Sequence, residues 1–385
     1  MTTAFLDRFS GGDPEATKLH ARLAEAGALA DALADLPPDV FDGLDVRGLN
    51  MGAMAVSDQP RKSVTDRCRM IELCGHGDPA LTVALPGPSL SMTVLERLGT
   101  PEPQNRMLAP FYCDDAVWGA FAVTEPGYGS DAAHLVTRAT KVNGGYSLTG
   151  EKRFIGNAGR ARYVVVFATT DAAKGQFGIR ALYVPIPSDG LKVDDTPTMT
   201  GMRVVRVSRL TFTDCFVPEE NLLGQGGSID LARSFAYAQL SFDAMRPCLS
   251  SLMNGASAGL LDRLRPSRAA LASVTRNGID AVTHAYEGPV SSARLLAMQA
   301  ARLFDAGVGS AIHASISKVN AQNVACGLVS ALLRIPGIED HPEEPLIRRW
   351  WRDFQAFKVM EGTRDVHHLM IARARLAAQT HTLAA

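Results

Sequence analysis

A single carboxylate near the C-terminus, Glu361, lies between two stretches in which apolar residues recur at helical spacing, 349–358 and 366–376. Gly362 interrupts the pattern between them, and Thr363 is a plausible N-cap for the second helix. An acid held between two apolar helices can lose solvent, which raises its pKa towards the range that a proton-abstracting base needs. Glu361 is therefore a candidate general base, although the same spacing is also that of an ordinary first-turn helix acid.

Two further sets of polar residues have a spacing that is typical of ligand-binding sites. The stretch 121–131, Phe-Ala-Val-Thr-Glu-Pro-Gly-Tyr-Gly-Ser-Asp, ends a predicted strand in a Pro/Gly turn whose amides and hydroxyls can bind a polar ring edge or a phosphate. The same residues are also typical of a plain β-turn with a helix cap. Asp243 and Arg246, at i and i+3, can pair on one helix face, either inside a site or as a solvated surface pair.

The elements that must position these residues are expected in the order helices, strands, helices. We predict a helical domain over residues 1–118, a compact antiparallel β-domain over 119–228 and a C-terminal helical bundle over 229–385, which together make an α+β fold. The expected helices cover 16–34, 63–74, 89–98, a stretch from 101, 229–245, 248–264, 289–306 and 311–333. The expected strands cover 162–168, 179–185 and 208–216, with a hairpin turn at 143–145 before a strand at 146–151.

Composition limits the class of protein. The 385 residues carry a formal net charge of −1, which argues against nucleic acid or an anionic membrane as the main partner. The six cysteines form no Cys-x-x-Cys pair and lie near no histidine cluster, so we expect reduced thiols and no metal site. The sequence contains no signal-peptide pattern and no apolar run of about 18 residues, so we expect a soluble cytoplasmic protein.

Three motifs resemble the acyl-CoA dehydrogenase family. Residues 360–373, Met-Glu-Gly-Thr-Arg-Asp-Val-His-His-Leu-Met-Ile-Ala-Arg, resemble its C-terminal signature, and residues 124–131 resemble its Thr-Glu-Pro-x-x-Gly-Ser-Asp motif. Residues 150–157 resemble its Gly-x-Lys-x-Trp-Ile-Thr-Asn motif. The resemblance covers residues 85–385 approximately, is weak over 265–340, and implies the family's three-domain fold with a C-terminal four-helix bundle.

The resemblance implies a flavoprotein with FAD, in which Glu361 is the base that removes the α-proton of an acyl thioester. Met245 stands where some branches of the family place the base instead, and methionine cannot take a proton. The implied FAD contacts are Phe121, Val123, Thr124, Gly129, Ser130, Phe154, Ile155, Gly156, Arg294, Thr363 and Asp365. The implied substrate contacts are Tyr128, Ser130, Asp243, Arg246, Met360 and Gly362.

The sequence departs from the family pattern at both ends of the cofactor. Phe154 replaces a tryptophan, and Gly156 replaces a threonine whose hydroxyl usually bonds flavin N5, which leaves the redox potential and oxygen reactivity open. The usual arginine and glutamine at the adenine side are absent, and Arg294 is a candidate to supply charge to the pyrophosphate. Because the cofactor sites of the family span subunits, we expect a homodimer or homotetramer.

We therefore expect FAD-dependent dehydrogenation of an acyl thioester, with an electron acceptor that the sequence does not identify. Met360, in place of the usual tyrosine, and the altered flavin contacts suggest a specialised member. The acyl group is then carried either by coenzyme A or by a carrier protein, as in relatives from secondary metabolism. Two other classes remain open: a flavin monooxygenase or oxidase on the same fold, and a catalytically inactive binding protein.

Overall fold

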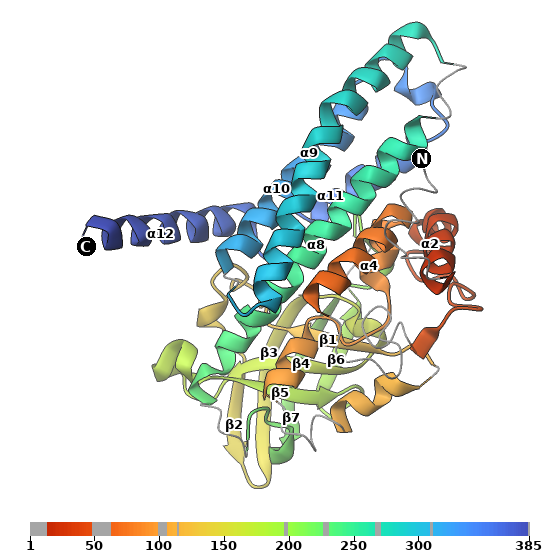
Figure 1. Cartoon of the computed structure of the whole chain (residues 1–385). Coiled ribbons are helices and arrows are strands. Elements are labelled where there is room, and N and C mark those ends of the chain that lie inside the picture. The colour runs from red at the N-terminus through yellow and green to blue at the C-terminus, as the bar shows by residue number, and fades with distance from the viewer. Residues whose placement is uncertain are drawn as a thin grey trace.

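The chain folds into a layer of long helices packed on a β-sheet (Figure 1). The computed structural model describes residues 14–47, 63–98, 106–113, 115–195, 199–225, 231–265, 271–308 and 311–383. Within these residues helices come first, strands follow and helices return, so the predicted α+β class and order are confirmed. The domain boundaries at 118/119 and 228/229 stay a prediction. No helix in the described ranges is both long and apolar enough to span a bilayer.

Three N-terminal helices match predicted segments within a few residues: α2 (Pro14–Leu33), α4 (Val64–Gly77) and α6 (Ser91–Leu98). The short helix α5 (Pro79–Ala84) was not predicted. α4 begins where predicted because Ser63 caps it, with a side chain that accepts the Asp66 N–H. The start of the helix expected from residue 101 lies outside the described residues, whereas Ala109–Tyr112 forms a 3-10 helix.

The strands form a mixed sheet in the order β1-β4-β2-β3-β7-β6, with β5 also paired to β4. They are β1 (Trp118–Ala122), β2 (Arg138–Val142), β3 (Gly145–Ile155), β4 (Ala161–Thr169), β5 (Ile179–Pro185), β6 (Leu191–Asp195) and β7 (Ser208–Pro218). The predicted hairpin joins β2 to β3 through Gly144, whose φ of +76° favours glycine. All three strands predicted from β-branched runs are present as β4, β5 and β7.

The expectation of a wholly antiparallel sheet is wrong for β1. This strand pairs with β4 in parallel, with Phe121 opposite Val165, and β2 adds one parallel pair with β4. The pairs β2–β3, β3–β7, β4–β5 and β6–β7 are antiparallel, as predicted. The cause is the connection from β1 to β4, which contains the whole β2–β3 hairpin and is therefore long enough for a parallel crossover.

Long helices run side by side after the sheet: α8 (Ser234–Leu264), α9 (Ser273–Asp305) and α10 (Ala311–Leu332). The prediction of two helices over 229–264 is wrong, because α8 continues through Pro247. α9 likewise starts well before Pro289, where the predicted helix began. A proline removes one backbone hydrogen bond. Around Pro247 consecutive residues are buried on every side of α8, so packing outweighs that loss.

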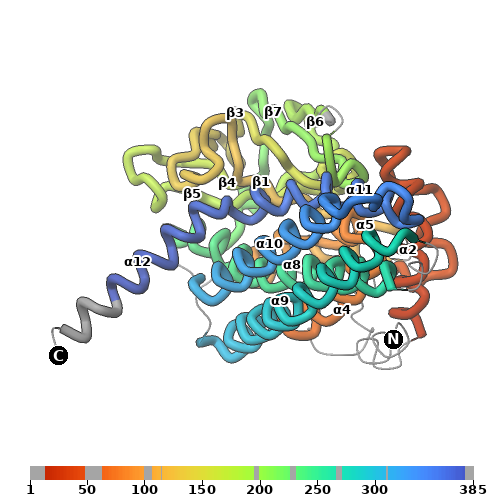
Figure 2. The backbone as a smooth tube through the Cα atoms, turned by 90° about the horizontal axis from the view of Figure 1, so that it is seen from above, coloured from red at the N-terminus to blue at the C-terminus, as the bar shows by residue number. Residues whose placement is uncertain are grey.

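α11 (Glu344–Ala356) and α12 (Arg364–Leu383) complete the described fold. α11 packs Trp350 and Phe354 into the helical core, whereas α12 projects away from the body (Figures 1 and 2). Figure 2 places the sheet on one side of α8 and α10, with α9 and α4 on the other side. The helical layer therefore includes α4 from the N-terminal part of the chain.

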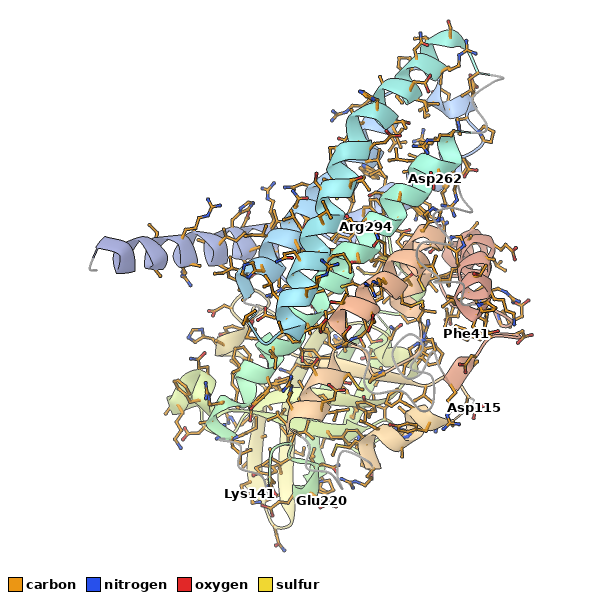
Figure 3. The ribbon with its side chains drawn as sticks, viewed as in Figure 1. Phe41, Asp115, Lys141, Glu220, Asp262 and Arg294 are labelled. Atoms are coloured by element: carbon orange, nitrogen blue, oxygen red, sulfur yellow. The ribbon has the colours of Figure 1, made fainter. Side chains whose placement is uncertain are left out.

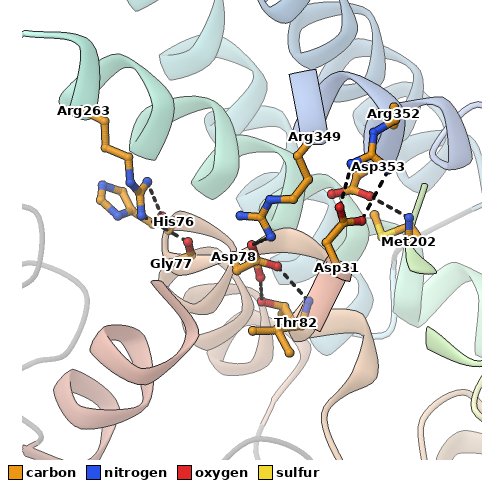
Figure 4. A network of polar contacts seen from close by, with 11 residues as sticks. Asp31, His76, Gly77, Asp78, Thr82, Met202, Arg263, Arg349, Arg352 and Asp353 are labelled. Carbon is orange, nitrogen blue, oxygen red and sulfur yellow. Dashed lines mark hydrogen bonds and ion pairs between the residues drawn. The ribbon is translucent and has the colours of Figure 1, made fainter. Parts of the chain in front are cut away.

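A network of charged residues fixes α11 against α2 and the β-domain (Figure 4). Arg352 pairs with Asp31 of α2 at 2.7 Å, and the buried Asp353 accepts the Met202 N–H at 2.6 Å. Burial raises the pKa of Asp353 to about 7, against the hydrogen bond from Met202. The turn that follows α11 therefore starts from an element that is anchored on two sides.

Candidate active site

The turn between α11 and α12 has a left-handed backbone. Glu361 has φ +55° and Gly362 has φ +103°, a region that costs a residue with a side chain roughly 1–2 kcal/mol. Thr363 then caps α12, since its Oγ1 accepts the Val366 N–H at 3.4 Å and its carbonyl accepts the His367 N–H. Such a backbone persists only where the surrounding contacts fix it.

Glu361 is partly exposed as a residue, but one oxygen of its carboxylate lies out of solvent. This Oε2 atom is buried and has no hydrogen-bond partner among the described residues. Burial raises the pKa of Glu361 to about 7, and the nearby cations of Arg246 and Lys318 oppose that shift. An ordinary first-turn helix acid would be solvated, so this burial favours the general-base interpretation.

Arg246 connects α8 to this turn. Its Nε donates to the Glu361 carbonyl at 3.1 Å, and its Nη1 pairs with Asp243 Oδ1 at 2.8 Å. Arg246 is buried, and burial raises the pKa of Asp243 against the opposing effect of Arg246. The pair predicted at i and i+3 is therefore largely withdrawn from water and is not a solvated surface pair.

Lys318 of α10 is a residue of this region that the sequence analysis missed. Its Nζ donates to the Gly362 carbonyl at 2.8 Å and to Gln322 Oε1 at 3.0 Å, and its side chain is fully buried. Burial lowers the pKa of Lys318 to about 8, and the Glu361 charge opposes this shift. The signal available in the sequence was a lysine in the largely apolar stretch 311–332, because a buried cation needs partners.

The stretch 121–131 runs from β1 into a loop that a buried ion pair holds in place. Glu125 pairs with Lys152 of β3 at 2.7 Å, and Lys152 also donates to the Val123 carbonyl at 3.0 Å. Glu125 in addition accepts two consecutive backbone N–H groups that follow the loop. Glu125 and Lys152, which belong to two of the motifs, therefore shape the loop, a role that the sequence analysis did not assign.

The end of β3 presents an exposed aromatic ring next to a residue without a side chain. Phe154 is 62% exposed and has φ +58°, at an irregular step of the β3–β7 pairing. A Cβ added at Gly156 would meet Val205 Cγ1 at 3.6 Å, an ordinary contact, so space remains there. The Arg153 N–H donates to the Thr124 carbonyl at 2.9 Å, which joins this end of β3 to the loop after β1.

A series of contacts connects the β-domain to Glu361. Phe121 of β1 packs edge-on against Phe242 of α8, with ring centres 5.6 Å apart. The Arg246 guanidinium lies 5.6 Å from the centre of the Phe242 ring and also reaches the Glu361 carbonyl. The fold thus brings Phe121, Arg246 and Glu361, which are far apart in the sequence, into one region.

The other expected contacts are spread along the loop, the strand end and the turn. The buried ones are Val123 and Ile155, the partly exposed ones are Thr124, Tyr128, Met360 and Thr363, and the exposed ones are Gly129, Ser130 and Asp365. The Asp365 side chain is 84% exposed and lies 3.6 Å from the Arg364 guanidinium. The exposed part of the loop leaves Ser130 accessible to a ligand.

Arg294 lies on α9, among the helices, whereas Lys141 and Glu220 mark the opposite end of the molecule (Figure 3). The Nε atom of Arg294 donates to the buried Glu72 carboxylate of α4 at 3.1 Å. Burial raises the pKa of Glu72 to about 7, and the Arg294 charge opposes this shift. The ion pair joins α4 to α9, so binding of a pyrophosphate by Arg294 would be additional to a structural role.

The residues of this region fit a planar ring with a polar edge, such as the isoalloxazine of FAD. Phe154 offers an exposed aromatic face, and the space at Gly156 is open beside it. The buried Oε2 of Glu361 lacks a partner within the described part of the chain, so it is available to a molecule bound there. The departures from the family motifs therefore leave a smaller aromatic surface but do not block the ring.

Two family models and a known relative match most of the chain. Residues 120–215 match the model of the acyl-CoA dehydrogenase middle domain, and residues 235–376 match that of the acyl-CoA dehydrogenase C-terminal domain. The mitochondrial short-chain specific acyl-CoA dehydrogenase of Sus scrofa is 32% identical over 282 residues, which cover 72% of this chain and 67% of the relative. The chain belongs to the acyl-CoA dehydrogenase family.

Solved structures agree with the fold of this acyl-CoA dehydrogenase family member. The FAD complex of PigA aligns with a TM-score of 0.82 at 22% identity, over 97% of this chain and 98% of PigA. The prolyl acyl carrier protein oxidase AnaB aligns with a TM-score of 0.77 at 19% identity, over 94% of this chain and 98% of AnaB. At these identities the likeness concerns the fold, and the predicted acyl-CoA dehydrogenase-like architecture is confirmed.

Proposed function

We propose that the protein is an FAD-dependent dehydrogenase of an acyl thioester, in which Glu361 removes the α-proton. The observation that carries this proposal is the Glu361 carboxylate: its Oε2 atom is buried without a partner within the described residues, and its pKa is raised to about 7. When bound, FAD would accept the hydride from the neighbouring carbon. The protein is thus an oxidoreductase that acts on a CH–CH bond.

The chain's own residues supply the base and its surroundings. Near pH 7 a large share of Glu361 is ionised, so its carboxylate can take a proton from a carbon acid held against Oε2. Exclusion of water around Oε2 keeps the carboxylate basic. We propose that the Glu361 backbone N–H donates to the thioester carbonyl, because polarising that carbonyl acidifies the α-proton. Arg246 would fix this backbone through the Glu361 carbonyl.

Glu361→Gln tests the proposed base. Glutamine has nearly the same shape but cannot take a proton, so the variant should bind FAD, keep its fold and lose roughly 10²- to 10⁴-fold in the rate of flavin reduction. The measurement is bleaching of the flavin absorbance by acyl thioesters without oxygen. The matched control is Glu220→Gln, an exposed position at the end of the molecule formed by the strands (Figure 3), which should react like the wild type. A Glu361→Gln rate near that of the wild type would refute the assignment.

The proposed FAD contacts comprise the loop after β1, the end of β3, the start of α12 and Arg294 at the pyrophosphate. Arg294→Ala should weaken FAD binding about tenfold, which corresponds to about 1.4 kcal/mol, in titrations of the apoprotein. Glu72→Gln is the control, because it removes the charge that pairs with Arg294 and leaves the guanidinium in place. An unchanged FAD affinity in Arg294→Ala would exclude Arg294 from the cofactor site.

We propose that the thioester is that of a specialised substrate, carried by coenzyme A or by a carrier protein. Met360 is partly exposed beside Glu361, and Gly156 leaves open space at the end of β3. Both departures alter the walls of the proposed pocket, and a carrier protein oxidase shares the fold. Bleaching by coenzyme A thioesters, compared with bleaching by acyl groups loaded on a carrier protein, distinguishes the two carriers. Steady oxygen consumption during turnover would favour the oxidase alternative.

We also propose that the protein assembles into a homodimer or homotetramer. α12 projects from the body of the molecule and exposes Leu369 to 57% (Figure 1). An apolar residue on a projecting helix is the kind of surface that a second copy can cover. A cytoplasmic location stays a prediction from the sequence.

A further inference from the structure

The two cations near Glu361 bind the main chain of its turn. Lys318 Nζ lies 2.8 Å from the Gly362 carbonyl oxygen, and Arg246 Nε lies 3.1 Å from the Glu361 carbonyl oxygen. Among the described residues, neither cation forms an ion pair within 4.0 Å of the Glu361 carboxylate. Both positive charges are therefore held close to the base without direct contact to its oxygens.

The turn needs such contacts because its backbone is unfavourable. Glu361 has a left-handed φ of +55°, and Gly362 has φ +103°. The turn is also crowded, since a Cβ added at Gly362 would lie 3.0 Å from His367 Nε2 of α12. Arg246 of α8 and Lys318 of α10 each donate a hydrogen bond to a carbonyl of the turn. Both residues therefore fix the direction of the Glu361 side chain.

A direct ion pair would serve the reaction less well. A cation in contact with a buried carboxylate favours its charged form strongly and makes it a weak base. A cation bound to the neighbouring carbonyls lies farther from the carboxylate and lowers its pKa less, because Coulomb attraction falls with distance. Lys318 and Arg246 thus moderate the basicity of Glu361 while their hydrogen bonds hold its backbone.

We infer that Lys318 is a positioning residue for the reaction: by holding the Gly362 carbonyl, it fixes the left-handed turn that aims the Glu361 carboxylate. This inference rests on the proposed function, since it assigns Lys318 a role only if Glu361 is the base. Arg246 holds the turn from the other side, but it is also a proposed substrate contact. Lys318 is not a proposed substrate contact, so a variant of Lys318 tests the turn without removing a contact to the substrate.

Charged and titratable groups face Glu361 from each helix packed against the turn. α8 contributes Asp243, Arg246 and Cys248, α10 contributes Lys318, and α12 contributes His367. Burial lowers the pKa of His367 to about 3, so this histidine is neutral in the working range of pH. The cations that act on the Glu361 carboxylate are therefore Arg246 and Lys318.

Lys318→Met tests the inference, since methionine keeps an apolar side chain but removes the charge and the donor. The acid limb of the pH profile for flavin reduction should move up by about one unit, and the smaller ionised share of Glu361 should lower the rate at pH 7 about fivefold. Amide hydrogen exchange of a peptide containing residues 359–366 should become faster, and this readout is independent of activity. Lys318→Arg should restore the acid limb towards that of the wild type.

The matched control is Gln322→Leu, which removes the second acceptor of Lys318 and leaves the charge and the Gly362 contact. It should keep the acid limb and the exchange rate of the turn. If Lys318→Met does not fold, Lys318→Gln, which also lacks the charge, must raise the acid limb. An unmoved acid limb with unchanged exchange in a folded, FAD-binding variant would overturn the inference. A wild-type protein that no acyl thioester reduces would instead overturn the proposed function, so the two failures differ.

Discussion

At the scale of single residues, the pKa of the proposed base Glu361 is set by opposing effects of its surroundings. Burial raises the pKa of Glu361, and the nearby cations Arg246 and Lys318 oppose this shift, so that the pKa lies at about 7. A general base is most effective when its pKa lies near the working pH. The balance therefore places the carboxylate where a change in either cation alters catalysis.

The pH dependence of flavin reduction follows from this balance. Only the ionised form of Glu361 takes a proton, so kcat/KM should rise about tenfold per pH unit below pH 7 and level off above it. Stopped-flow measurements of flavin bleaching between about pH 5 and pH 9 would show this limb. A profile that is flat across pH 7 would contradict the raised pKa.

Stability should change with pH in the opposite sense. In the folded protein the pKa of Glu361 lies above its ordinary value of 4.5. The contribution of Glu361 to the free energy of unfolding is therefore fully present below pH 4.5 and is lost as the pH rises through about 7. Glu361→Gln lacks this charge and should be more stable than the wild type at pH 8, by roughly 3 kcal/mol at most. Urea unfolding of both proteins at pH 5 and pH 8 would measure the difference.

The sequence predicted the Asp243–Arg246 pair because the two residues have a regular helical spacing, and it singled out Glu361 because residues 360–373 form a local motif. Lys318 could not be found in this way. Its acceptor is a backbone carbonyl of Gly362, which any residue at that position would supply and which only the folded chain brings close. The lysine in the apolar stretch 311–332 indicates a buried cation, but residue types do not show which distant main-chain carbonyl it binds.

At the scale of elements, α8 joins the two halves of the site. Phe242 contacts β1, and Arg246 one turn later contacts the turn before α12. The sequence predicted a break between these residues and the rest of the helix at Pro247, but the continuous α8 gives them a rigid support. Local proline rules failed there because burial on every side of the helix outweighed them, an effect of tertiary packing. The parallel β1–β4 pair was missed for a related reason, since strand order depends on the whole chain.

The Glu125–Lys152 ion pair joins the loop after β1 to β3, and we expect its loss to lower the free energy of unfolding strongly. Both side chains are buried, and removing one partner leaves the other charge unpaired, which costs about 3–5 kcal/mol. Lys152→Met should therefore lower the melting temperature and loosen the loop 123–137 that contains Ser130. Thermal unfolding measures the loss, and the double variant Lys152→Met with Glu125→Gln should recover part of it. A single variant as stable as the wild type would show that the pair is dispensable.

At the scale of the whole molecule, α12 projects beyond the elements around it (Figures 1 and 2). It starts at the Glu361 turn and then leaves the body, so its outer part contacts little of the molecule (Figures 1 and 2). Its beginning, by contrast, is held by His367, which is buried and bonds Ser315 of α10 at 3.0 Å. A partner covering the exposed part would therefore contact the helix that begins at the turn of the proposed base Glu361.

This arrangement predicts that assembly depends on α12. Leu369→Asp places a charge on its exposed apolar surface and should weaken self-association at least tenfold, because an interface with a buried unpaired charge is strongly disfavoured. Sedimentation velocity over a range of concentrations would show a shift towards the monomer. Val274→Asp is the matched control, since Val274 is exposed to the same 57% on α9, away from α12. Equal association of Leu369→Asp and wild type, or a wild type that stays monomeric at high concentration, would exclude α12 as the interface between copies.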